Sequence, residues 1–404
     1  MNFNVRRHAS DNNIFYFAKE LDINNHRIKT PIPMMHHSLT SAVIPSEVEN
    51  RAFEMWKSFD INKIQNAAID NGQARYIGNS VSDVGNSVNS SDFKILFTGV
   101  KNFQTNPFRQ LDHGLRQILM DNAYRFTDFV TFPILSKISH SSTPHLLMDR
   151  YLAYIQDCYE ISETLNNKPI MGIISPVPIH FIPKIVDKYL SLGVDCFCFD
   201  FEGSGLNSYY AHYQALLRQL FMYDRTEFGK KVKYAINMKL PSNTNRNGPF
   251  PAEDLLIPAI GVDFLGINHI AGGSSPKKTT KKSSQRSNRP TRVSSRINLV
   301  DTNVYSYRRI SDISEFHENF SEPLITPNFS DFTTVNANQK RQFSRNFNYI
   351  SRNLEMSGIH DQIMNNESIS RGILNKPGLD NSRKRIIRSI KSSVQSPGIE
   401  AYFN

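Results

Sequence analysis

Short apolar segments alternate with segments of helical spacing between residues 170 and 273, and this repeat constrains the fold more than any other feature of the chain. The apolar segments are Ile170–Ile174, Val194–Phe201, Tyr234–Met238 and Asp263–His269. Strands that are apolar on both faces and alternate with helices are typical of a parallel sheet. Because ligands of such sheets bind at the carboxyl ends of the strands, the repeat predicts both an α/β fold and the place of a site.

The length of the chain suits a barrel with an appended unit, since an eightfold strand–helix barrel needs about 250 residues and the chain has 404. We predict a (β/α)8 TIM-type barrel over 1–273, a disordered basic linker over 274–296 and a mostly helical C-terminal extension over 297–404. Further strands are expected at 32–35, 93–98 and 129–132, a loop at 76–92, and helices at 111–122, 144–166, from Pro251, and roughly at 337–356 and 382–393.

Positive charge is concentrated in two segments of a chain whose formal net charge is +10. Residues 277–296 contain eight lysines or arginines and no acid, and residues 383–391 contain five more. Such clusters usually bind the phosphates of nucleic acids or of a membrane surface, and a solvated tail without a partner is the alternative. We predict nucleic-acid binding by Lys277, Lys278, Lys281, Lys282, Arg286, Arg289, Arg383, Lys384, Arg385 and Arg388.

The three cysteines cannot build a disulfide framework. Cys196 and Cys198 flank Phe197 in a predicted strand, so both are expected to point to one face and to pack as small apolar side chains. No run of 18 apolar residues exists, and the N-terminus lacks the apolar core of a signal sequence. We therefore expect a cytoplasmic protein that does not enter a membrane.

Five segments resemble sequences of the tRNA-guanine transglycosylases, in the same order and with similar spacing. They are Ile23–Met35, Ile44–Glu47, Ile170–Ile174, Leu192–Phe197 and Pro251–Phe264. The resemblance implies a barrel that exchanges a guanine in tRNA for a 7-deazaguanine by double displacement. In that family one aspartate attacks the ribose, a second handles protons, and the target base is extracted from its stack.

The chain departs from this family at the residues that carry its chemistry. Gly266 stands where the resemblance implies the nucleophilic aspartate, and Gly99 stands where it implies the second aspartate. Ser175 replaces a glutamine of the family. Because no cysteine follows Cys198, the family's zinc ligands are absent, and we expect neither a metal nor a cofactor.

Two other carboxylates, Asp200 and Glu202, stand at the end of a predicted strand. In an extended chain they share a face, so we predict that they form a catalytic pair, with binding of a ribose hydroxyl or a structural role at a helix start as alternatives. The adjacent histidines 36 and 37 point to opposite faces of an extended chain and make a poor metal site. Candidates for binding a base or ribose are Ser175, Gly203, Gly205 and His269.

These observations leave three functions open. The first is a diverged, transglycosylase-like enzyme that exchanges bases in tRNA or another nucleic acid with a rearranged set of carboxylates. The second is a non-catalytic paralogue that binds nucleic acid and pairs with a catalytic paralogue or with a second copy of itself. The third, an unrelated barrel enzyme, ranks lowest because Lys239 is its only candidate lysine and no glycine-rich phosphate loop accompanies it.

Overall fold

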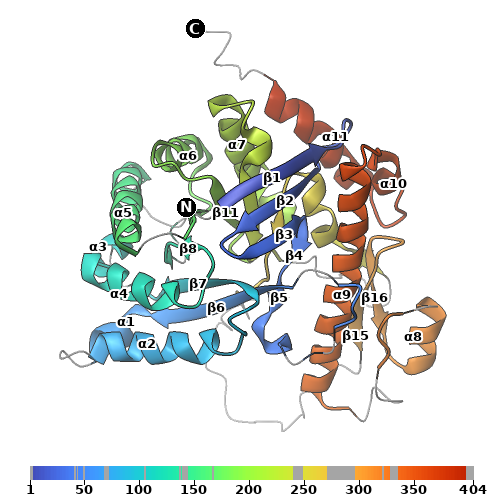
Figure 1. Cartoon of the computed structure of the whole chain (residues 1–404), viewed down its shortest axis with the longest axis horizontal. Helices are drawn as coiled ribbons and strands as arrows, with labels where there is room; N and C mark the ends of the chain where they lie inside the picture. The colour runs from blue at the N-terminus through green and yellow to red at the C-terminus, as the bar shows by residue number, and fades with distance from the viewer. Residues whose placement is uncertain are drawn as a thin grey trace, which may run out of the picture.

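Two parallel sheets form the centre of the molecule (Figure 1). The computed structural model describes residues 3–40, 42, 44–48, 51–67, 72–103, 106–135, 138, 144–165, 168–239, 249–270, 296–320, 323–327 and 335–396. One sheet has six strands, in the order β4 (Ile32–Pro33), β14 (Phe264–Leu265), β12 (Val232–Ile236), β11 (Cys196–Asp200), β10 (Ile170–Ile174) and β8 (Val130–Thr131). The other has four, in the order β5 (Met35–His36), β6 (Ala52–Asp60), β7 (Phe93–Lys101) and β9 (Ile134–Leu135).

Two short segments of the chain each join an edge strand of one sheet to an edge strand of the other. Only Met34 separates β4 from β5, and only residues 132 and 133 separate β8 from β9. Proline stands at both junctions, as Pro33 and Pro133, and a proline has no N–H to donate to a ladder of hydrogen bonds. Each of these two segments therefore gives one short strand to each sheet.

Helices connect successive strands and lie around the outside of the sheets (Figure 1). In α6 the buried residues Ile182, Ile185, Val186, Tyr189 and Leu190 follow the spacing of one helix face, which packs inward. The helices of this layer are α1 (Ile61–Asn66), α2 (Gly72–Gly85), α3 (Pro107–Gln110), α4 (His113–Tyr124), α5 (Pro144–Leu165), α6 (Ile182–Ser191) and α7 (Leu206–Tyr223). Shorter 3-10 turns are η1 (His37–Leu39), η3 (Ile179–Phe181), η4 (Phe228–Lys230), η5 (Glu253–Leu255) and η6 (Ile257–Ala259).

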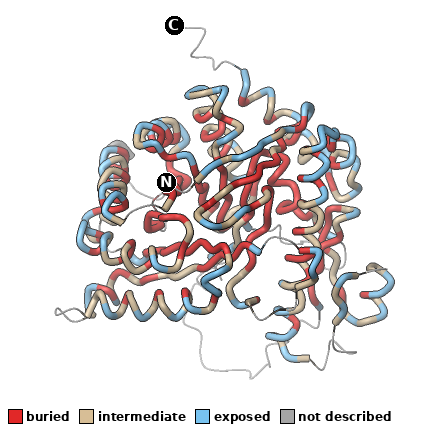
Figure 2. Tube along the Cα trace, viewed as in Figure 1, coloured by how far each residue is buried: buried red, intermediate tan, exposed pale blue. Residues whose placement is uncertain are grey.

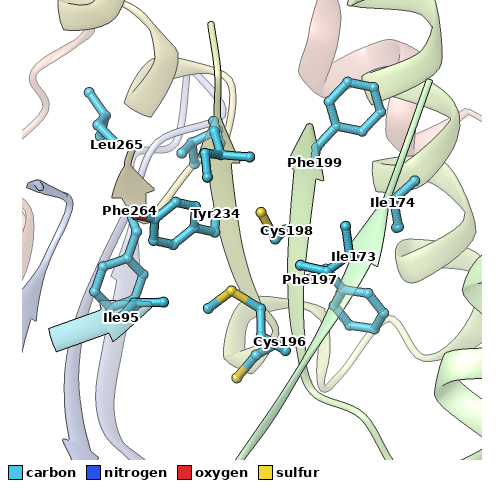
Figure 3. Packing of buried hydrophobic residues seen from close by; sticks show 14 of the residues in the cluster. Ile95, Ile173, Ile174, Cys196, Phe197, Cys198, Phe199, Tyr234, Phe264 and Leu265 are labelled. Atoms are coloured by element: carbon cyan, nitrogen blue, oxygen red, sulfur yellow. The ribbon is translucent and has the colours of Figure 1, made fainter. Parts of the chain in front are cut away.

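The central strands are buried on both faces (Figure 2). In β11 the sulfurs of Cys196 and Cys198 point to the side of Tyr234 on β12, while Phe197 and Phe199 point the other way (Figure 3). All three cysteines of the chain are free and buried, so the expectation that Cys196 and Cys198 pack as small apolar side chains on one face is confirmed. Burying each aromatic side chain of such a core stabilises the fold by about 1.5–3 kcal/mol.

A three-stranded antiparallel sheet covers the amino ends of the parallel strands. Its strands are β1 (Phe3–Ser10), β2 (Phe17–Ile23) and β3 (His26–Thr30). Lys19 of β2 is wholly buried, and its Nζ donates to Asp263 Oδ2 at 2.7 Å and to the carbonyl of Lys231 at 2.6 Å. Asp263 and Lys231 directly precede β14 and β12, so this sheet closes the amino end and leaves the carboxyl end for a site.

The C-terminal segment packs against the rest of the molecule. It contains β15 (Ile297–Asp301), β16 (Ser306–Ile310), α8 (Ile313–Asn319), α9 (Ala337–Met364), α10 (Ser370–Leu374) and α11 (Asn381–Gln395). β16 pairs with β13 (Phe250–Pro251), which lies in the chain between β12 and β14. α9 contacts β1 to β4, and His360 on α9 hydrogen-bonds through Nδ1 to the carbonyl of Thr30 at 2.8 Å.

The prediction of an α/β fold with parallel strands is confirmed, and three local expectations differ. The loop expected at 76–92 is wrong up to Gly85, because Ile77 and Val81 lie one helical turn apart and bury one face of α2. The helix expected from Pro251 is replaced by β13, η5 and η6. β6 was not expected at all. Among the described residues, no helix is long and apolar enough to cross a membrane.

Candidate functional site

Asp200 is the last residue of β11 and lies buried at the carboxyl end of the parallel strands. Its Oδ1 accepts hydrogen bonds from the backbone N–H of Glu202 at 2.9 Å and from Nδ2 of Asn237 at 3.0 Å. Burial disfavours the charged carboxylate and raises the pKa of Asp200 to about 7. The Asp200 carboxyl therefore keeps a proton up to nearly neutral pH and can donate it there.

The two residues that donate hydrogen bonds to Asp200, Glu202 and Asn237, both have left-handed backbones. The φ angle is +46° at Glu202 and +58° at Asn237. This region is uncommon for residues other than glycine, and such strained positions concentrate at binding and catalytic sites. Here the strain is held by hydrogen bonds, because the Gly203 N–H donates to the Asn237 carbonyl at 2.8 Å while Asp200 accepts from Glu202.

A second carboxylate, Glu54, comes from β6 and is completely buried. Its Oε1 accepts from the Ile267 N–H at 2.9 Å and lies 2.5 Å from Nε2 of His269. Its Oε2 accepts from the hydroxyl of Tyr234. Burial raises the pKa of Tyr234 well above its usual value, so this hydroxyl stays protonated and donates. Three donors thus converge on one buried carboxylate.

His269 is fixed by three contacts. Glu54 holds its Nε2, its backbone N–H donates to Oδ1 of Asn237 at 3.0 Å, and its ring stacks on Trp56 with centroids 5.2 Å apart and planes 8° apart. In the described part of the chain, Nδ1 of His269 has no hydrogen-bond partner. The contact with the carboxylate places a proton on Nε2, and in the neutral imidazole Nδ1 then carries the lone pair that can act as a base. Asn237 links His269 directly to Asp200.

Gly266 stands at the position for which the resemblance implies a nucleophile. A Cβ atom built there would lie 2.6 Å from the Ala235 carbonyl oxygen, from Glu54 Oε2 and from a Tyr234 ring carbon. Real Cβ atoms essentially never approach other atoms so closely. The space of an aspartate side chain is therefore taken by Glu54 and Tyr234.

Gly99 lies on β7, at the position for which the resemblance implies the second aspartate, and a neighbouring side chain fills the space beside it as well. A Cβ atom there would lie 2.5 Å from Cζ2 of Trp56. Both glycines are thus packed against side chains of β6, Glu54 at one and Trp56 at the other. The structure accommodates no carboxylate at either position without displacing a neighbour.

The structure brings together most of the residues expected at the site. Asp200, Glu202, Gly203 and His269 meet around Asn237. The expectation that Asp200 and Glu202 share a face of an extended strand is wrong, because β11 ends at Asp200 and the chain then turns at a positive φ. The negative charge of Glu202 nevertheless lies close enough to contribute to the raised pKa of Asp200.

The remaining candidates for ligand binding lie beside this group. Ser175 is buried just after β10, next to the hydroxyl of Tyr151. Gly205 precedes the first residue of α7, and a Cβ there would make only ordinary contacts, the nearest at 3.7 Å with Glu253. Within the ranges that the structure describes, no three His, Cys, Asp or Glu side chains come together as metal ligands.

The residues expected to bind nucleic acid fall into two sets. Lys277, Lys278, Lys281, Lys282, Arg286 and Arg289 lie outside the described residues. On α11, Arg383 forms ion pairs with the buried Glu253 and with Asp380, so its charge is neutralised within the protein. Lys384 is half-buried and Arg385 and Arg388 are exposed, and none of the three side chains forms a hydrogen bond or ion pair with another described residue.

The sequence patterns did not point to Glu54, Trp56, Tyr234 or Asn237 as site residues. The available signals were weak: Trp56 is the only tryptophan of the chain, and Asn237 directly follows the last residue of β12. The chain matches no protein-family model, and no curated protein shows significant sequence similarity to it.

Proposed function

We propose that the chain is a diverged, transglycosylase-like enzyme that exchanges a base in tRNA or another nucleic acid, built on one closed (β/α)8 barrel. The strand pairing supports the barrel. β14 pairs with β4 and β5 pairs with β6, and Met34 alone separates β4 from β5. β8 and β9 provide the same link on the other side. Eight parallel segments then follow one another around a closed ring.

The observation that carries the proposed activity is the pairing of a proton donor with a proton acceptor through Asn237. Exchange of a base at the anomeric carbon needs protonation of the departing base and deprotonation of the incoming one. Asp200, with a pKa of about 7, supplies the first proton. Nδ1 of His269, held in place by Glu54 at Nε2, takes up the second. Asn237 donates to the Asp200 carboxyl at 3.0 Å and accepts from the backbone N–H of His269 at 3.0 Å, so it links the two residues.

The proposed exchange is a single displacement. Glu54 is a poor nucleophile because it is completely buried and its two oxygens accept from three donors. Gly266 offers no nucleophile and leaves no room for one. In this scheme the bond from C1′ to the old base breaks as the base takes the proton of Asp200. The incoming base forms the new bond to C1′ and loses its proton to His269.

The parallel aromatic rings at the site favour a nucleobase as the group that the enzyme exchanges. The rings of Trp56 and His269 are nearly parallel, and planar aromatic surfaces hold extracted bases by stacking. The exposed Arg385 and Arg388 of α11 offer positive charge for the phosphates of a polynucleotide. The five similar segments agree with this choice of substrate.

A second candidate is a non-catalytic nucleic-acid-binding protein that partners a catalytic paralogue or a second copy of itself. The observation that favours it is the filling of both glycine positions by side chains of β6. Because Glu54 and Trp56 fill the space beside Gly266 and Gly99, the two aspartates that the family uses for catalysis cannot stand there. In this case Asp200 serves only to hold the turn at Glu202.

The two candidates are separated by incubating the protein with tRNA and radiolabelled guanine or 7-deazaguanine. The enzyme proposal predicts incorporation of label, and Asp200→Asn, which keeps the shape of the side chain, is expected to lower it by about 100-fold or more. Asp195→Asn, at the exposed residue directly before the same strand, is the matched control and is expected to leave incorporation unchanged. Label that enters equally well with Asp200→Asn would exclude Asp200 as the proton donor.

Absence of incorporation, together with retained binding of tRNA, would favour the second candidate. His269→Gln sharpens the comparison, because glutamine keeps a polar side chain but cannot act as a base. The single-displacement scheme predicts slower exchange for this variant and a pH profile that no longer depends on the imidazole.

A further inference from the structure

A cavity of about 450 Å³ lies outside the strands, between α3, α4 and α5. None of its lining residues belongs to the group around Asp200. α3 follows the carboxyl end of β7, and α5 follows the carboxyl end of β9, so the cavity lies in the half of the helix layer nearer the proposed active site. It is lined by Asn106, Phe108, Arg109, Arg116, Arg150, Ala153, Tyr154 and Asp157.

Arg116 forms the fixed wall of this cavity. One end of its guanidinium is paired with Asp157, and Nη2 donates to the carbonyl of Phe108 at 2.8 Å. Its guanidinium carbon lies 5.1 Å from the centre of the Tyr154 ring. The remaining Nε–H is buried and has no acceptor among the described residues.

Two further arginines of the cavity are exposed and unpaired. The side chains of Arg109 on α3 and Arg150 on α5 form no hydrogen bond or ion pair with any other described residue. Asn106 uses Oδ1 to accept from the Phe108 N–H at 3.0 Å, and this leaves its Nδ2 free to donate into solvent or to a ligand. The cavity thus contains three arginines and one carboxylate, Asp157, which already forms ion pairs with Arg116 and His113.

We propose that this cavity binds a phosphate group. Guanidinium groups bind phosphate through two parallel hydrogen bonds, and arginine is the residue that proteins favour for this purpose. The volume is larger than a phosphate needs and leaves room for the sugar attached to it. The phosphate comes either from the backbone of a polynucleotide that crosses the carboxyl end of the strands or from a free nucleotide. The inference goes beyond the proposed base exchange and does not depend on it.

The test compares Arg109→Gln and Arg150→Gln with Arg75→Gln. Arg75 is an exposed arginine of α2, also without a partner among the described residues, so the control removes the same charge from a neighbouring helix. Binding of inorganic phosphate, of guanosine monophosphate and of a single-stranded oligoribonucleotide is measured by calorimetry at two salt concentrations. Thermal melting of each variant verifies the fold.

The proposal predicts that Arg109→Gln and Arg150→Gln each weaken binding about tenfold, whereas Arg75→Gln changes it little. If the phosphate belongs to a polynucleotide, the loss appears with the oligoribonucleotide, and the slope of log K against log salt falls by about 1. If it belongs to a free nucleotide, the loss appears with guanosine monophosphate and inorganic phosphate. Equal behaviour of all three variants with every ligand would overturn the proposal.

Discussion

At the scale of single residues, the buried Asp200 carboxyl is expected to make the free energy of unfolding depend on pH. Its pKa rises from 3.8 to about 7 on folding because the side chain is buried. Between these two values the folded protein holds more protons than the unfolded chain, so the free energy of unfolding decreases as the pH rises. Asp200→Asn removes this dependence and keeps an oxygen to accept from Glu202 and Asn237.

We therefore expect Asp200→Asn to be more stable than the unchanged protein above about pH 8, by on the order of 3 kcal/mol, and similar to it below about pH 4. Urea unfolding over this pH range measures the difference directly. A gap between the two proteins that stays constant with pH would show that burial does not perturb this carboxyl. The same variant tests proton donation, so one substitution addresses both stability and activity.

At the scale of secondary-structure elements, β6 decides what the site contains. Its side chains fill the space beside Gly266 and Gly99. We expect Gly266→Ala to destabilise the protein by about 1–3 kcal/mol, because the new methyl group would lie 2.6 Å from three atoms. Gly358→Ala in α9 is the matched control, since a Cβ there meets nothing within 4 Å and alanine favours a helix. Denaturant midpoints of both variants give the comparison, and equal stability would refute the packing argument.

The contrast between β11 and β6 shows which parts of the site the sequence could predict. β11 is a continuous apolar run that ends in Asp200, so both the strand and its terminal carboxylate could be recognised locally. β6 contains Glu54, Lys57 and Ser58 among its apolar residues and has no regular alternation. The burial of Glu54 depends on donors such as Tyr234, which lies 180 residues away in the chain. No local pattern reports such a contact, so this part of the site was missed.

At the scale of the whole molecule, ion pairs connect the C-terminal segment to the turn η5, which lies in the chain between β12 and β14. Arg352 of α9 donates to Asp254 at 2.8 Å, and the Tyr307 hydroxyl of β16 donates to the same carboxylate at 2.5 Å. Arg383 of α11 pairs with Glu253 of the same turn. The separation of residues 297–404 from residues 1–273, which the sequence suggested, stays a prediction, and these contacts favour unfolding as one unit.

Two signals can follow the central sheets and the C-terminal segment separately. The fluorescence of Trp56, the only tryptophan of the chain, reports on β6, and far-ultraviolet circular dichroism also reports on the long helix α9. We expect both signals to change in one transition during urea unfolding. Asp254→Ala leaves Arg352 without its partner, which costs about 3 kcal/mol, and should move both transitions together. A helical signal that unfolds before Trp56 fluorescence changes would show that the C-terminal segment is an independent domain after all.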